Sequence, residues 1–113
     1  MAIRVVTFIG EVCVDPLDGR RLFEEIKALL GTGEYVDVDF AGVTTLTSSF
    51  LNEGIGRLYG ELPLSDVDRR IRFHGLDSAD QSLLGLVRRN AIRYYGASAV
   101  ERDALAKLSD DKA

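Results

Sequence analysis

The chain has 113 residues, of which 46% are hydrophobic and 28% charged, a composition typical of a single globular domain. The formal net charge of −4 weighs against a nucleic-acid-binding protein, because such proteins usually present a basic face. No apolar run approaches the roughly 20 residues that cross a bilayer, and the start of the chain lacks the pattern of a secretory signal, so we expect a cytoplasmic protein that does not enter a membrane.

Two residue types that often carry chemistry occur once each. Cys13 can form neither an internal disulfide nor a cysteine-based zinc cluster, and its apolar neighbours indicate a small buried hydrophobe. His74 is the only histidine and lies within a strand pattern, which favours a structural role. We therefore expect no metal site and no cofactor.

The chain begins with a strand pattern and then a helix pattern. Residues 3–9 are β-branched and apolar and predict a strand, and a tight turn at Gly10 would lead to a short return strand around Cys13. Asp15 is expected to cap the following helix, with Pro16 at its first position. Its apolar face is expected to contain Leu22, Phe23, Ile26, Leu29 and Leu30.

A second strand and a second helix follow. Residues 35–40 alternate apolar and acidic side chains, which predicts a strand with one covered and one polar face. A helix is expected to begin near Ser48 and to end at Pro63. Gly54 and Gly56 inside it reduce helix propensity, so we expect them to allow a close approach of the helix to the sheet.

A third strand and a third helix complete the domain. Residues 69–76 predict the strand, again with one apolar and one polar face. Ser78 and Gln81 match a capping box at the start of the helix, which is expected to end at Gly96.

Strands that alternate with amphipathic helices predict an α/β fold with a mixed, mostly parallel sheet of about four strands. The polar faces of the second and third strands indicate that the helices lie mainly on one face. The domain is expected to span residues 1–97, and residues 98–113 are expected to form a tail with a short helix followed by a disordered end.

Hydroxyl side chains gather where the second strand leads into the second helix, in the stretch "DFAGVTTLTSSFLNE". One hydroxyl is enough to cap a helix, and Thr47, Ser48 and Ser49 provide three. Sites in open α/β folds gather beyond the carboxyl ends of strands, and a helix N-terminus tolerates a phosphate. The cluster therefore has two interpretations, a simple cap or a phosphorylatable switch.

The stretch "VDVDFAGVTTLTSSFLNEGIGRL" resembles the central strand, turn and helix of STAS domains, the fold of bacterial anti-sigma factor antagonists. Asp39 and Phe40 match the strand end of the family motif, and Ser48 and Ser49 match its two serines. Thr47 stands where that motif has Asp, and the residue after the serines is Phe rather than Gly. With its Ser-Ser-Phe motif, the chain is most similar to an uncharacterised STAS-like family of unknown function.

The resemblance implies a non-enzymatic regulatory module that binds a protein through the turn and helix starting at Thr47–Phe50. The partner would resemble an anti-sigma factor or another histidine-kinase-like ATPase. Ser49, or alternatively Ser48, would accept a phosphate that switches binding. The residues expected to form the binding surface are Asp39, Thr47, Ser48, Ser49, Phe50 and Glu53. For Phe50, an apolar anchor for the partner and a place in the core are both open.

Other functions remain as alternatives. A serine nucleophile requires a base, His74 is the only histidine, and no GxSxG, Walker A or GxGxxG pattern occurs, so we do not expect an enzyme. A sensor that binds a small molecule or nucleotide at the same turn stays open. So does a homodimer formed through an exposed edge of the sheet.

Overall fold

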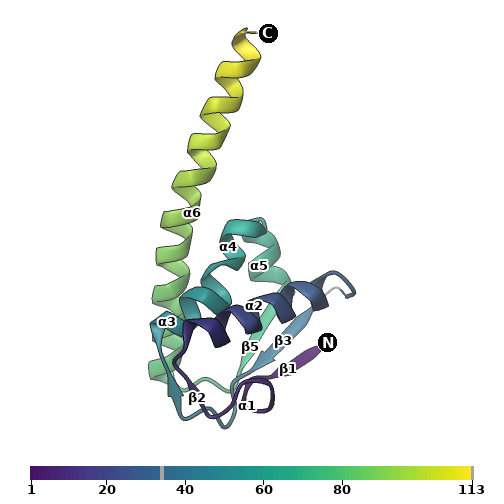
Figure 1. Cartoon of the computed structure of the whole chain (residues 1–113), viewed down its shortest axis with the longest axis vertical. Helices are drawn as coiled ribbons and strands as arrows, with labels where there is room; N and C mark the ends of the chain where they lie inside the picture. The colour runs from purple at the N-terminus through teal and green to yellow at the C-terminus, as the bar shows by residue number, and fades with distance from the viewer. Residues whose placement is uncertain (34, 113) are drawn as a thin grey trace.

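The computed structural model describes residues 1–33 and 35–112, with residues 97–112 described by their backbone only. The described residues form two sheets, and every strand pair in them is parallel (Figure 1). The main sheet has the order β1-β3-β5, with strands Ala2–Arg4, Val36–Asp39 and Ile71–His74. The small sheet consists of β2, Val12–Cys13, and β4, Thr45–Leu46.

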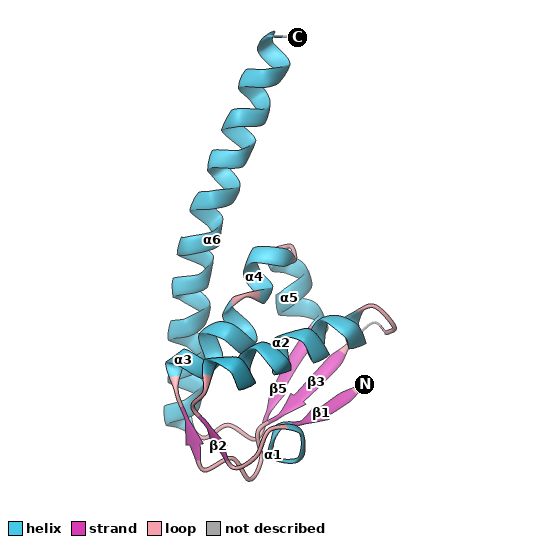
Figure 2. Ribbon diagram, in the orientation of Figure 1, coloured by secondary structure: helices cyan, strands magenta, loops and turns pink. Residues whose placement is uncertain are grey.

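Helical elements connect and cover these strands. They are α1 (Val5–Phe8), α2 (Pro16–Leu30), α3 (Ser48–Leu51), the π-helical segment η1 (Asn52–Gly56), α4 (Leu58–Glu61), α5 (Leu64–Arg70) and α6 (Ser78–Lys112). Helices α2, α4 and α5 lie together over one face of the main sheet (Figure 2). The predicted α/β class with a mostly parallel sheet is confirmed, although the part of the chain that the structure describes has five short strands in two sheets instead of one sheet of about four.

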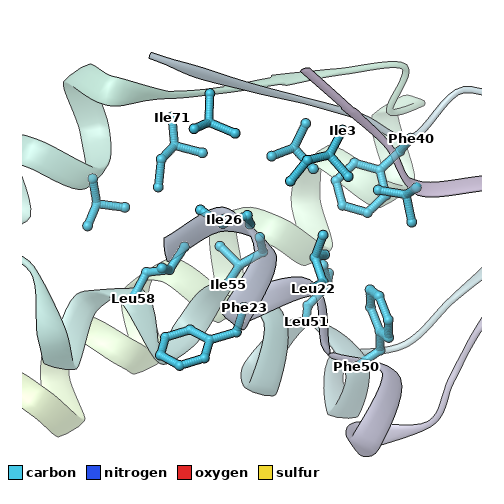
Figure 3. Packing of buried hydrophobic residues seen from close by; sticks show 14 of the residues in the cluster. Ile3, Leu22, Phe23, Ile26, Phe40, Phe50, Leu51, Ile55, Leu58 and Ile71 are labelled. Carbon is cyan, nitrogen blue, oxygen red and sulfur yellow. The ribbon is translucent and has the colours of Figure 1, made fainter. Parts of the chain in front are cut away.

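The core lies between the main sheet and the helices (Figure 3). Alternate residues of the strands, such as Ile3, Val38 and Ile71, are buried on the helical side. The opposite face carries polar side chains, among which Arg72 and His74 are exposed. The predicted division of these strands into an apolar and a polar face is therefore confirmed.

The N-terminal segment differs from the prediction. The strand ends at Arg4, and the chain then turns into α1, whose Val5 is fully buried. Gly10 adopts a φ of 138°, which reverses the chain without forming a hairpin. Residues 12–13 do form a strand, but it pairs in parallel with β4. The predicted pairing of this strand with the first strand is therefore wrong, because long-range pairing overrides the local turn signal.

Helix α2 forms as predicted. The Asp15 carboxylate accepts a hydrogen bond from the Leu17 N–H at 2.8 Å, and Pro16 occupies the first helical position. Its face contributes Leu22, Phe23, Ile26 and Leu30 to the core, and Leu29 is half-buried.

The helix that starts at Ser48 is interrupted by η1, in which the Arg57 N–H bonds to the Asn52 carbonyl at 3.1 Å. Its glycines do allow a close approach, but to helices rather than to the sheet. A Cβ on Gly54 would lie 3.2 Å from the Gly19 carbonyl oxygen of α2, and one on Gly56 would contact α6. The expected contact with the sheet is therefore wrong.

Two further differences concern the C-terminal half. Helix α5, between the second predicted helix and β5, was not expected. At α6 the cap is Asp77, whose Oδ1 accepts the Asp80 N–H at 2.8 Å, and Gln81 Nε2 donates to the Leu76 carbonyl instead of closing a capping box with Ser78.

Helix α6 continues through Gly96 to Lys112 and extends away from the other elements (Figure 1). The backbone is therefore helical where a short helix and a disordered end were expected, and the last residue, 113, lies outside the described residues. The boundary between a domain of residues 1–97 and a tail of 98–113 stays a prediction. Within the part of the chain that the structure describes, no helix has both the length and the apolar character needed to span a bilayer.

Candidate functional site

The turn after β3 is held by backbone and side-chain hydrogen bonds. The Asp39 carboxylate accepts the Ala41 N–H at 2.9 Å, and the Phe40 N–H donates to the carbonyl of His74 at 2.8 Å. Gly42 follows with a φ of 88°, a conformation that favours glycine. Asp39 thus orients an amide of the turn, and its carboxylate is engaged within the chain.

Thr47 caps the helix and ties it to β2. Its Oγ1 accepts the Phe50 N–H at 3.3 Å and lies 3.4 Å from the Val14 carbonyl oxygen, to which it can donate. The Thr47 N–H donates to the Cys13 carbonyl at 3.2 Å. One hydroxyl of the cluster therefore has the structural task that the sequence assigned to a helix cap.

Ser48 and Ser49 come directly after this cap and are both exposed. Within the described side chains, neither hydroxyl forms a hydrogen bond. The two serines are therefore the surplus hydroxyls of the cluster, and both are accessible to a modifying enzyme or a partner.

Phe50 is fully buried in the core, close to Leu51 (Figure 3). Of the two interpretations left open by the sequence, the structure shows core packing, so Phe50 offers no surface to a partner. The helix that carries it lies tightly against α2, since a Cβ on Gly19 would be 2.4 Å from the Phe50 carbonyl oxygen. Phe50 and Gly19 together fix the backbone that presents the serines.

Glu53 is half-buried and forms an ion pair within its own helix. Its Oε2 lies 3.0 Å from Arg57 Nη1, and the Arg57 guanidinium stacks 5.4 Å from the centre of the Phe23 ring. Partly exposed pairs of this kind contribute only a few tenths of a kcal/mol. Glu53 is thus oriented toward Arg57, which lies one turn further from the serines.

Three exposed apolar residues in the segment that leads from β2 into α2 were not predicted as site residues. Val12, Val14 and Leu17 expose 54%, 41% and 73% of their surfaces. Val12 and Val14 come close to the turn because β2 pairs with β4, which leads into Thr47 and the serines. Leu17 follows them in the first turn of α2. The position of Leu17, outside the apolar face of α2, was the available sequence signal.

The only cysteine, Cys13, and the only histidine, His74, both lie in surroundings that indicate structural roles. Burial, with a smaller contribution from Asp18, raises the pKa of Cys13 to about 11, so its thiol is protonated at neutral pH. His74 Nε2 lies 2.9 Å from Asp37 Oδ1 on the polar face of the sheet, and this hydrogen bond is the main cause of the lowered pKa of Asp37. Among the described residues, no serine hydroxyl contacts His74 and no cluster of potential metal ligands occurs.

The fold and this strand–turn–helix site define an α/β domain of the STAS-like class. A scan against protein-family models matched residues 18–81 to the "STAS-like domain of unknown function (DUF4325)". The match covers more than half of the chain, and the chain belongs to this family. STAS-like domains are typically non-enzymatic. Comparisons with curated proteins and with solved structures gave no match.

Proposed function

We propose that this chain is a non-enzymatic regulatory module that binds a protein partner through the turn and helix start at Thr47–Ser49, together with the neighbouring apolar residues. The observation that carries the proposal is the combination of two exposed, unbonded serines with Val12, Val14 and Leu17. Exposed apolar side chains gathered beside polar ones are a common feature of protein–protein interfaces.

The site is suited to recognition because hydrogen bonds and close packing hold its backbone in place. Thr47 joins the helix start to β2, and the Gly19–Phe50 contact joins it to α2. A surface that is ordered before binding loses less conformational entropy when the partner docks. Asp39 and Glu53 support this arrangement through their contacts with Ala41 and Arg57.

Ser49 is the proposed switch, with Ser48 as the alternative acceptor. A phosphate adds about −1.5 to −2 charges at neutral pH. Placed beside the apolar residues, it would have to be desolvated when the partner docks, which opposes binding. The resemblance to anti-sigma factor antagonists makes an anti-sigma factor or another histidine-kinase-like ATPase the proposed partner class.

The first experiment isolates the tagged chain from its native cell and identifies bound proteins and any phosphate by mass spectrometry. The affinity of the purified partner is then measured for the chain and for Ser49→Glu and Leu17→Asp. We expect each substitution to weaken binding at least about tenfold, equal to about 1.4 kcal/mol.

Ser65→Glu is the matched control, because Ser65 is also exposed but lies on α5, away from α3 (Figure 1). It should leave the affinity unchanged. If Ser49→Glu and Leu17→Asp both bind like the unmodified chain, the proposed surface is wrong. If only Ser49→Glu does so, the surface stands and the switch is wrong.

A further inference from the structure

A groove lies between β5 and the first turns of α6. Its volume is about 530 Å³, within the range of small-molecule sites. Helix α6 packs mainly on α3, η1 and α4. The short loop through Gly75 and Leu76 joins β5 to α6 at one end of the groove, and α4 and α5 contribute residues to its lining.

The lining of the groove combines apolar and polar side chains, and the apolar ones come from α5, β5, the loop after β5 and α6. Val67 and Ile71 are buried, and Phe73 and Leu84 are half-buried. On the α6 side, Gly85 leaves the groove open, because a Cβ at this position would have no atom within 4 Å. An apolar body could therefore contact both sides of the groove.

Polar groups gather toward the α4 and α5 end. Arg88 forms a two-pronged pair with Asp68, Nη2 to Oδ2 at 2.6 Å and Nε to Oδ1 at 3.1 Å. The Tyr59 side chain interacts with both, and its burial, followed by the charge of Asp68, raises its pKa, so its hydroxyl keeps its proton. This end therefore offers hydrogen-bond donors and acceptors with a net charge of zero.

The length of the groove can be judged from α6. Gln81 and Arg88 both line it and lie two helical turns apart, which is about 10 Å along the helix axis. A molecule that fills this length has an apolar part beside Leu84 and Gly85 and its polar part at Arg88.

We propose that this groove binds an uncharged, amphipathic small molecule with a carbonyl or amide group at one end. The apolar body would lie between Ile71 and Gly85, and the polar group would contact Tyr59, Arg88 and Asp68. A carboxylate is disfavoured because Asp68 already neutralises Arg88 and would repel a second anion. This binding site is separate from the serine turn and does not depend on the function proposed for it.

The test uses two probes of the same shape, 3-phenylpropanamide and 3-phenylpropanoate, titrated into the full isotope-labelled chain and followed by amide NMR shifts. We expect the amide to bind the more tightly of the two and to shift the signals of Gly75, Gln81, Gly85 and Arg88. If neither probe shifts these signals, or if the carboxylate binds more tightly than the amide, the proposal is wrong.

Two variants, Gly85→Leu and Tyr59→Phe, test where the ligand binds, and a third, Gly96→Leu, is a control. Gly85→Leu adds a side chain to the lining of the groove at a position where a Cβ meets no atom within 4 Å, and it should weaken amide binding at least about tenfold. Gly96→Leu is its matched control, since a Cβ on Gly96 also meets no atom and this residue does not line the groove. Tyr59→Phe removes one hydrogen bond and should weaken binding about fivefold. Equal affinity of Gly85→Leu and Gly96→Leu contradicts binding in the groove.

Discussion

Gly19 and Gly85 lie on different helices and show how differently two positions in this domain are packed. On α2, a Cβ on Gly19 would lie 2.4 Å from the Phe50 carbonyl oxygen, so only a glycine allows the two backbones to approach. On α6, a Cβ on Gly85 would meet no atom within 4 Å. The first glycine is required by close packing, whereas the second leaves a space. Sequence alone does not distinguish these two situations.

The difference separates the two proposed sites. The close contact at Gly19 holds the helix that carries the exposed serines against α2, a property suited to recognition by a macromolecule. The space at Gly85 belongs to a groove lined by apolar and polar side chains, a property suited to a small molecule. The following predictions test this contrast, beginning with the largest expected effect.

Gly19→Ala is expected to lower the free energy of unfolding by about 1–3 kcal/mol, because the methyl group meets backbone atoms that cannot rotate away. Gly85→Ala is the matched comparison and should raise it by up to about 1 kcal/mol through helix propensity. Urea denaturation of both variants measures the two changes. Equal changes of the same sign in the two variants would show that Gly19 and Gly85 are packed alike.

Thr47→Ala is expected to lower the free energy of unfolding by about 1 kcal/mol, because the helix loses its cap and the hydroxyl contact with the Val14 carbonyl just after β2. Ser49→Ala should change it by less than about 0.5 kcal/mol, since Ser49 is exposed and its hydroxyl has no bond among the described side chains. Thermal or urea unfolding gives the comparison. If Ser49→Ala lowers the free energy of unfolding more than Thr47→Ala does, the assignment of the capping role to the Thr47 hydroxyl is wrong.

The smallest expected change in stability at neutral pH concerns Cys13, whose carbonyl accepts the Thr47 N–H. Its pKa is raised from an ordinary 9.0 to about 11, so the folded state favours the protonated thiol. The stability that this provides is present below about pH 9 and is lost as the pH rises to about 11.

We expect Cys13→Ala to remove this component of the pH dependence while other groups titrate as before. The difference between the urea midpoints of the unmodified chain and of Cys13→Ala, measured across this pH range, isolates the effect of thiol ionisation on stability. A constant difference would contradict the raised pKa. In addition, thiol reagents should react slowly with the folded chain and rapidly in urea.

Much of the fold follows from local patterns. Asp15 and Pro16 start α2 as the sequence predicts, since capping depends on neighbouring residues only. The alternation through Val36, Val38 and Phe40 likewise determines which face of β3 is buried. These features require no knowledge of distant residues.

The site was predictable only in part. The serines were identified from a motif, and Thr47 was among the expected caps. The exposed residues Val12 and Val14 were missed because they reach the turn through the β2–β4 pairing, which joins segments about 30 residues apart. Leu17 was missed with them, since it follows in the first turn of α2.

The sequence by itself determined the α/β class, the cap and start of α2, and the position of the serine turn, because each depends on short-range periodicity or hydrogen bonding. Only the tertiary structure decided that Phe50 belongs to the core, that the helix glycines face other helices, and that β2 pairs with β4. The physical reason is the same in each case. Burial, close approach and strand pairing depend on which distant segment lies opposite, and a single sequence does not specify that segment locally.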